Sequence, residues 1–217
     1  KKEMDMLSDE DFYRSLNHIK QSTSYLSNTI DDFRNFIKNS NDKGEIRVSD
    51  IIKKTLSILN PSIVNHNITI VLNTKDDMKI YGYENQLIQA LINILHNASD
   101  ALASKLKETD LRIIKITTKQ IEDSVSIEII DNAGGIDKDI INKIFEPYFT
   151  TKHKYQGTGL GLYMTHKIIQ TSMKGKISVS NDKFIFENKE CIGALFRITL
   201  KNNTWLTFTQ PFDTISL

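Results

Sequence analysis

Apolar residues recur at alternating spacings of four and three along residues 9–39, which is the pattern of a heptad seam on one long helix. Ser8 and Asp11 fit a capping box at its start, and residues 1–7 would be the end of a preceding helix. Because one seam cannot bury itself, this helix needs a partner helix, a second chain, or packing against its own domain. The seam consists of Phe12, Leu16, Ile19, Thr23, Leu26, Ile30, Phe33 and Ile37.

A different pattern begins after the polar linker of residues 39–44. Alternation of apolar and polar residues predicts strands, and longer apolar stretches predict helices. The order of these elements indicates an α+β fold, an α/β sandwich in which helices cover one face of a mixed sheet. This domain would span residues 45–200, followed by a C-terminal tail, 201–217, of unassigned role. The predicted strands are residues 46–48, 68–72, 112–118, 124–130, 176–180, 184–187 and 194–200, and the predicted helices are residues 49–59, 84–104 and 159–172.

Composition narrows the function classes. The net charge of +1 gives no reason to expect nucleic acid or an anionic membrane as a partner. No apolar run reaches the roughly 18 residues of a membrane span, and no signal peptide is present. We therefore expect a cytoplasmic fragment, beginning at Lys1, without direct membrane contact, whose parent protein could be anchored elsewhere. The single cysteine, Cys191, suits a reducing compartment, and residues 191–196 predict a buried core strand.

The predicted helix 84–104 carries one polar stripe. Asn93, Asn97 and Asp100 are separated by four and three residues, so they lie on the same face. The rest of the helix is apolar and would be buried, so these polar groups need partners. Amide oxygens suit Mg²⁺, a hard cation that is usually shared with phosphates. Hydrogen bonding between helices is the other interpretation.

Three later segments are rich in glycine or aromatic residues. Residues 131–136, Asp-Asn-Ala-Gly-Gly-Ile, place a carboxylate at a strand end where a base could donate to it, although a plain turn is the alternative. Residues 144–152 indicate a loop anchored by aromatic side chains, as lids often are. Residues 157–162, Gly-Thr-Gly-Leu-Gly-Leu, open a helix and would offer backbone N–H groups to phosphate. Their spacing fits neither a P-loop nor the dinucleotide-binding glycine pattern.

Together these segments resemble the four boxes of the histidine-kinase members of the Bergerat-type ATP-binding fold. Residues 93–101 resemble the N box, residues 131–136 the first glycine box, residues 145–149 the F box and residues 157–162 the second glycine box. Their order and spacing also match, although Ala133 stands where many members have glycine. The resemblance implies ATP and Mg²⁺ as cofactors.

The resemblance also implies roles for individual residues. Asn97 would hold Mg²⁺ with Asn93 assisting, which makes both catalytic, and Asp131 would bind the adenine amino group. The complete set of implied nucleotide-binding residues is Asn93, Asn97, Asp100, Asp131, Gly135, Ile136, Phe149, Thr150, Thr151, Lys152, Gly157, Thr158, Gly159, Leu160, Gly161 and Leu162.

The implied reaction is transfer of the γ-phosphoryl group of ATP to a histidine, followed by relay to an aspartate of a response-regulator receiver domain. Residues 1–40 would be part of a dimerisation and phosphotransfer helical hairpin that forms a homodimer. His18 would lie on the second helix of that hairpin and is followed by Ile19 and Lys20 rather than by an acidic residue. We therefore expect the acceptor histidine to be absent from this segment.

Two alternative functions share the fold. In the ATPases of heat-shock chaperones, mismatch repair and type II topoisomerases, a glutamate four residues before the Mg²⁺ asparagine is the general base for water. Here that position is Asn93, and an amide cannot take a proton from water at neutral pH. The second alternative is a non-catalytic nucleotide-binding module, either a pseudokinase or an anti-sigma-type binding module. The intact nucleotide residues argue against a pseudokinase, and the predicted dimerisation helix argues against an anti-sigma-type module.

Overall fold

The computed structural model describes residues 43–75, 78–152 and 157–202 as continuous segments. Within the predicted heptad helix, the described positions are all helical, and the apolar seam residues among them, Leu16 and Ile19, are 44% and 62% exposed. The remainder of the predicted hairpin, including His18, and the tail from residue 203 lie outside the described residues. The described helical positions are Tyr13, Leu16, Ile19, Lys20 and Thr23.

A five-stranded mixed sheet forms the centre of the domain, in the order β2-β4-β5-β7-β6. β2 runs parallel to β4, and the other neighbours pair antiparallel. A separate two-stranded sheet pairs β1 with β3. The strands are β1 Gly44–Arg47, β2 Ile68–Asn73, β3 Lys79–Gly82, β4 Arg112–Ile121, β5 Ser124–Asp131, β6 Lys176–Phe186 and β7 Lys189–Lys201. The predicted mixed sheet is confirmed.

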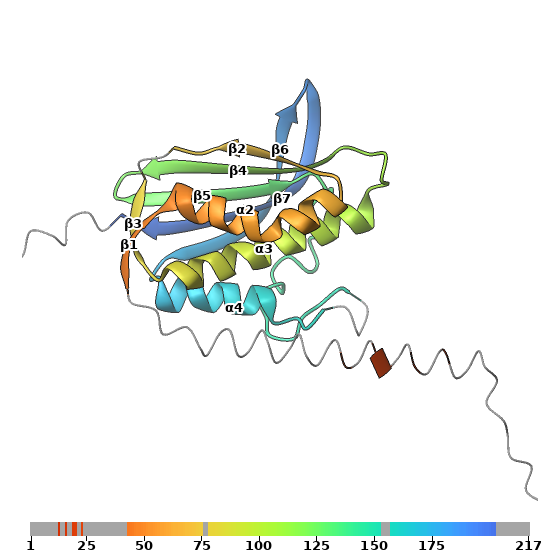
Figure 1. Cartoon of the computed structure of the whole chain (residues 1–217), viewed down its shortest axis with the longest axis horizontal. Helices are drawn as coiled ribbons and strands as arrows, with labels where there is room; N and C mark the ends of the chain where they lie inside the picture. The colour runs from red at the N-terminus through yellow and green to blue at the C-terminus, as the bar shows by residue number, and fades with distance from the viewer. Residues whose placement is uncertain are drawn as a thin grey trace, which may run out of the picture.

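Among the described residues, three helices lie on one face of the larger sheet (Figure 1). They are α2 (Val48–Asn65), α3 (Glu84–Lys105) and α4 (Gly161–Lys167), and the last continues as a π-helical turn, Ile168–Ser172. The predicted sandwich with helices on one face is therefore also confirmed.

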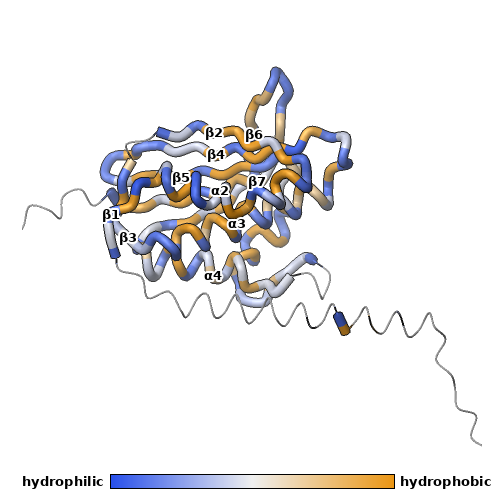
Figure 2. Tube along the Cα trace, in the orientation of Figure 1, coloured by the Kyte–Doolittle hydropathy of each residue, from blue (hydrophilic) through white to orange (hydrophobic). Residues whose placement is uncertain are grey.

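The main core lies between these helices and the sheet. Leu91 and Ile94 of α3 and Ile127 and Ile129 of β5 are at most 2% exposed and belong to one apolar cluster. Figure 2 shows the same division, since the hydrophobic stretches gather in the central strands and the helices while the hairpin tips are hydrophilic. Burial of the apolar sides of α3 fixes its rotation, which decides where its polar stripe points.

The prediction was wrong about the end of α2 and did not include β3. The helix predicted for residues 49–59 extends to Asn65, past Pro61. Leu59 and Ile63 continue its apolar stripe and pack against the core, which offsets the backbone hydrogen bond that proline removes. β3 was not predicted, because its four residues are too few to show a period.

The last three predicted strands are in fact two. Residues 176–180 and 184–186 belong to one hairpin arm, β6, which pairs with β7 along its whole length. The turn uses Glu187 and Asn188, whose φ angles of 46° and 63° are left-handed. The polar stretch at residues 181–183 suggested a break, but β6 is an edge strand, and polar side chains are tolerated there.

The sheet face away from the helices carries a smaller apolar cluster of Ile113, Ile130, Phe184 and Leu195. Cys191 lies at the margin of this cluster, opposite Phe184 in the hairpin register, and is only half-buried. The buried core position predicted for Cys191 was therefore wrong. The reason is that this end of the hairpin projects beyond the helix-covered part of the sheet (Figure 1).

Candidate functional site

The polar stripe of α3 meets a lysine from the loop that follows β5. Lys152 Nζ donates a hydrogen bond to Asp100 Oδ2 and lies 3.5 Å from Asn97 Oδ1. His96 Nδ1 lies 3.1 Å from the same Asp100 oxygen. Asn97 and Asp100, predicted from helical spacing, and Lys152, predicted as a lid residue, are thus brought together at one point.

The charge of Asp100 is stabilised by these neighbours. Burial alone would raise the pKa of Asp100, but the hydrogen bonds and positive charges of His96 and Lys152 outweigh burial and lower the pKa to about 2. Asp100 is therefore a carboxylate at physiological pH. The local environment on this face of α3 favours a cation.

Asn93 ties α3 to the start of α4. Its Nδ2 donates to the Gly161 carbonyl at 3.1 Å and to Thr165 Oγ1 at 3.3 Å. The Thr165 hydroxyl in turn donates to the Gly161 carbonyl at 2.9 Å. Asn93 could hold a cation only through its amide oxygen, so its role as a helper of Asn97 stays a prediction.

Asp131 ends β5 as a buried carboxylate, 4% exposed. Its Oδ1 accepts the backbone N–H groups of Ala133 at 2.8 Å and of Ala194 at 3.4 Å. Burial raises the pKa of Asp131, while these hydrogen bonds and the charge of Lys105 oppose the rise. A buried acceptor held by the backbone of the following loop and of β7 is suited to a single, directional hydrogen bond from a ligand.

Gly193 is a site residue that the sequence reasoning missed. It lies on β7 directly against Asp131, and a Cβ at this position would overlap the Asp131 carbonyl oxygen. The available signal was a lone glycine inside an apolar strand, which marks a close approach of two backbones. Gly193 therefore allows β7 to cover the end of β5.

The predicted glycine loop follows Asp131. Gly134 and Gly135 have φ angles of +79° and +84°, a conformation that favours glycine. Asn181 of β6 and Lys105 of α3 both donate hydrogen bonds to this loop, and neither was predicted. Ile136, which was predicted, is half-buried and packs against the main core.

The second glycine segment packs against the lid loop. Gly159 has a φ of +66°, and a Cβ there would overlap the Tyr148 backbone. A Cβ on Gly157 would approach Thr150 Oγ1 to 2.9 Å. The Thr150 hydroxyl oxygen accepts the Lys152 N–H at 3.1 Å. The structure thus brings the segments 145–152 and 157–162 into contact, as one loop unit.

The remaining predicted residues belong to this loop unit. Phe149 is half-buried against the main core, which anchors the loop as expected. Phe145 makes an edge-to-face contact with Phe196, with ring centroids 6.5 Å apart. Thr158 Oγ1 accepts the Leu160 N–H at 3.2 Å, just before α4. The other predicted positions are exposed Thr151, buried Leu160, and half-buried Gly161 and Leu162.

These residues fit a nucleotide with a divalent cation. The ammonium of Lys152 already places a positive charge beside Asn97 and Asp100, at the point predicted for Mg²⁺. Asn97 contributes an oxygen ligand of the kind that Mg²⁺ prefers. At the other end, the buried Asp131 carboxylate offers an acceptor for an amino group.

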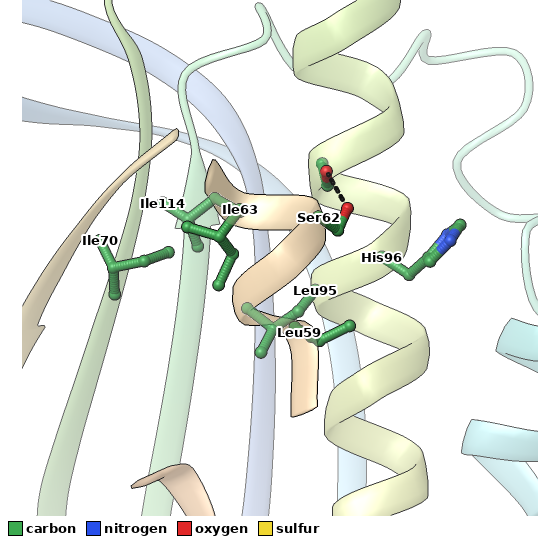
Figure 3. A pocket seen from close by; sticks show the side chains of 8 residues that line it. Leu59, Ser62, Ile63, Ile70, Leu95, His96 and Ile114 are labelled. Carbon is green, nitrogen blue, oxygen red and sulfur yellow. Dashed lines mark hydrogen bonds between the residues drawn. The ribbon is translucent and has the colours of Figure 1, made fainter. Parts of the chain in front are cut away.

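A small cavity lies away from this site, between α2, α3 and the sheet (Figure 3). Its volume of about 10 Å³ suits a single water molecule rather than a nucleotide. Ser99 Oγ lies 2.9 Å from His66 Nδ1 and 3.5 Å from Ser62 Oγ, so these groups join α2 to α3. The lining residues are Leu59, Ser62, Ile63, Ile70, Leu95, His96, Ser99 and Ile114.

Sequence relatives point to one family. Residues 82–204, more than half of the chain, match the family described as histidine kinase-, DNA gyrase B-, and HSP90-like ATPase. Sporulation kinase E of Bacillus subtilis (strain 168) is 35% identical over 158 residues, which cover 72% of this chain and 19% of that protein. The chain therefore corresponds to a small part of this relative's length.

Solved structures of histidine kinases share the fold of this chain. The nucleotide-free catalytic domain of histidine kinase ThkA matches with a TM-score of 0.62 and 28% identity, covering 75% of this chain and 97% of that domain. Histidine kinase ThkA in complex with the response regulator protein TrrA matches in fold, with a TM-score of 0.64, 24% identity, and coverage of 93% and 54%. No helix among the described residues has the length and apolarity needed to cross a bilayer. The chain belongs to the histidine kinase-, DNA gyrase B-, and HSP90-like ATPase family, and its domain is of the kind found in sensor histidine kinases.

Proposed function

We propose that this domain binds MgATP and donates its γ-phosphoryl group to a histidine on a dimerisation hairpin. The observation that carries the proposal is a site with two distinct ends. A buried acceptor, Asp131, lies at one end, and the cation-favouring stripe of Asn97 and Asp100 lies at the other. A nucleotide needs both ends, because its neutral base is bound through hydrogen bonds and its anionic phosphates attract a cation.

Each end has a defined task in this proposal. Asp131 accepts a hydrogen bond from the adenine amino group. Asn97, with Asn93, holds Mg²⁺, which neutralises phosphate charge when it is bound. Lys152 exchanges its ion pair with Asp100 for one with the phosphates. In the transfer, the bond from the γ-phosphorus to the β–γ bridging oxygen breaks as a bond to an imidazole nitrogen forms, and ADP leaves. Positioning and charge neutralisation supply most of the catalysis.

Phosphotransfer is favoured over the chaperone-type ATPase by the residue at position 93. Asn93 is an amide whose Nδ2 is engaged with α4, so it cannot serve as the base that water attack needs. A neutral histidine imidazole is already a nucleophile and needs no such base. The named relative, sporulation kinase E, is a kinase as well.

The proposed function also implies two partners for this domain. Leu16 and Ile19, on the predicted seam, are exposed within this chain, which supports a second copy as the partner that covers them. ThkA, of the same fold, forms a complex with a response regulator, which supports a receiver domain as the acceptor of the relayed phosphoryl group. We place the domain in the cytoplasm, where ATP and such receiver domains are found.

Two measurements on this chain test the proposed function. Equilibrium titration should give tighter binding of ATP than of GTP, which has a carbonyl in place of the adenine amino group. Loss of one charge-assisted hydrogen bond corresponds to about 1.5–3 kcal/mol, or roughly ten- to a hundredfold in affinity. Equal affinity for both nucleotides would sink the assignment of Asp131.

Phosphotransfer is tested with γ-labelled ATP. The chain alone should stay unlabelled and turn over far more slowly than the median enzyme value of about 10 s⁻¹. Addition of an upstream helix that carries a histidine should produce acid-labile, base-stable label. Label on the chain itself that His18→Ala abolishes would place the acceptor at His18, and brisk hydrolysis would revive the ATPase alternative.

A further inference from the structure

The glycine loop after Asp131 is fastened by the side chain of Asn181. The Asn181 Oδ1 accepts the Ile136 N–H at 2.8 Å, and its Nδ2 donates to the Ile136 carbonyl at 2.7 Å. One carboxamide thus pairs with both backbone groups of a single residue, as a neighbouring strand would. A Cβ on Gly135 would come within 2.5 Å of the Asn181 Oδ1, so the loop lies directly on this side chain.

The same hairpin holds the other end of the loop. Asn181 of β6 pairs with Ala194 of β7 in the strand register. The Ala194 N–H donates to Asp131 Oδ1 at 3.4 Å, and the Ile192 carbonyl accepts the Gly134 N–H at 2.9 Å. Adjacent positions of one hairpin therefore contact the loop at its start, its middle and its end.

Lys105 of α3 is a second side chain that contacts the loop. It is the last residue of α3, and its Nζ donates to the Gly135 carbonyl at 2.7 Å. Gly135 therefore lies between a lysine of the helix that carries the polar stripe and an asparagine of the edge strand. We name Asn181 and Lys105 the loop clamp.

We infer that the loop clamp positions the loop of residues 131–136 for the base of the nucleotide, with Asn181 and Lys105 as positioning residues. The inference rests on the proposed function. Gly134 and Gly135 are left-handed glycines, and glycine loses more conformational freedom on ordering than any other residue. A loop that is already ordered spares the nucleotide this cost when it binds. The clamp thereby supplies the rigidity that the glycines lack.

The test uses ADP without Mg²⁺, because this ligand reports mainly on the base end. Asn181→Leu removes both hydrogen bonds at similar volume, and Lys105→Met removes the ammonium. Each should weaken ADP binding about three- to tenfold and lower the preference for ATP over GTP in parallel. The preference is a ratio, so a variant that merely loses folded protein would leave it unchanged.

Three controls complete the design. Lys183→Ala removes an exposed ion pair with Glu190 on the same hairpin and should change neither affinity nor preference. Lys105→Arg should restore the binding that Lys105→Met loses. In a double-mutant cycle the two clamp variants should be non-additive, because both residues hold one short segment.

Hydrogen exchange of the Ile136 amide in the nucleotide-free protein gives a readout independent of ligand. The amide should be protected in the wild type and exchange faster in Asn181→Leu. Unchanged ADP affinity and preference in Asn181→Leu, beside a wild type that binds ADP, would overturn the inference. A wild type that binds no adenine nucleotide would overturn the proposed function instead.

Discussion

The proposed nucleotide site has a base end at Asp131 and a phosphate end at Asn97 and Asp100, and the two ends differ in the contacts that hold them. At the base end, Asp131 is buried and held by backbone N–H groups, with the backbone of Gly193 pressed against it. At the phosphate end, Asn97, Asp100 and Lys152 meet through side chains that are only half-buried. Backbone contacts between strands cannot be rearranged without opening the sheet, whereas a lysine can exchange one anion for another. We infer that selectivity comes from the rigid end and nucleotide exchange from the adaptable one.

The largest effect is expected where the rigid end is broken. Gly193→Ala places a Cβ on the Asp131 carbonyl oxygen, so β5 and β7 must separate, at a cost of about 3 kcal/mol in the free energy of unfolding. Gly44→Ala is the matched control, since no atom lies within 4 Å of its new Cβ, and it should change stability by less than about 0.5 kcal/mol. Urea denaturation measures both. Equal midpoints for the two variants would show that the close approach is not needed.

Asp131→Asn should remove the charge at the base end while leaving the fold. ATP affinity should fall by roughly ten- to a hundredfold, equally with and without Mg²⁺. Burial raises the pKa of Asp131, so the wild type should also lose ATP affinity as pH falls through this raised value, because the neutral acid is the weaker acceptor. ATP titrations at several acidic pH values should show this fall in affinity in the wild type and not in the variant. A pH dependence of ATP affinity that persists in Asp131→Asn would point to another titrating group.

Asn97→Ala tests the proposed Mg²⁺ ligand at the phosphate end. The Mg²⁺-dependent tightening of ATP binding should drop by about tenfold or more, while binding of ADP without Mg²⁺ stays near the wild-type value. Ser104→Ala, an exposed change on the same helix, is the control and should behave as the wild type. If Mg²⁺ still tightens ATP binding in Asn97→Ala, the metal ligand lies elsewhere on α3.

The smallest effect concerns Asp100. Its pKa is lowered to about 2 in the folded chain, so its contribution to stability is present above the unfolded value near 4 and is lost as pH falls from there toward 2. Asp100→Asn should abolish this part of the pH dependence and, with allowance for exposure, cost about 1 kcal/mol at neutral pH.

Glu128→Gln is the matched control for this change. Glu128 also has a lowered pKa: burial would raise it, but hydrogen bonds and charges from Lys119 and Arg197 prevail. It lies on the sheet face away from the helices. Both variants should flatten the acid side of the stability curve, measured by thermal melts at several pH values. Only Asp100→Asn should alter nucleotide binding, and an equal change in Glu128→Gln would break the comparison.

The sequence alone determined which residues share a face. The spacing of Asn93, Asn97 and Asp100 defines a stripe through helical geometry, and the alternation in β5 defines its buried side through strand geometry. The order of the four motif segments was sufficient for the family, and the order of the predicted strands and helices was sufficient for the helix-covered mixed sheet. The structure and the relatives confirm both. These features are local or follow from the order of motifs along the chain.

Only the tertiary structure decided which distant groups meet. Asn181 and Gly193 reach the glycine loop because the strand order places β7 beside β5 and β6 beyond it. Lys105 reaches it because α3 packs on β5. No local period encodes that order, because a pattern specifies the face that a side chain occupies and not the partner opposite it. The partial burial of Cys191 and the continuation of α2 past Pro61 were decided in the same way, by what lies across from each residue once the layers have packed.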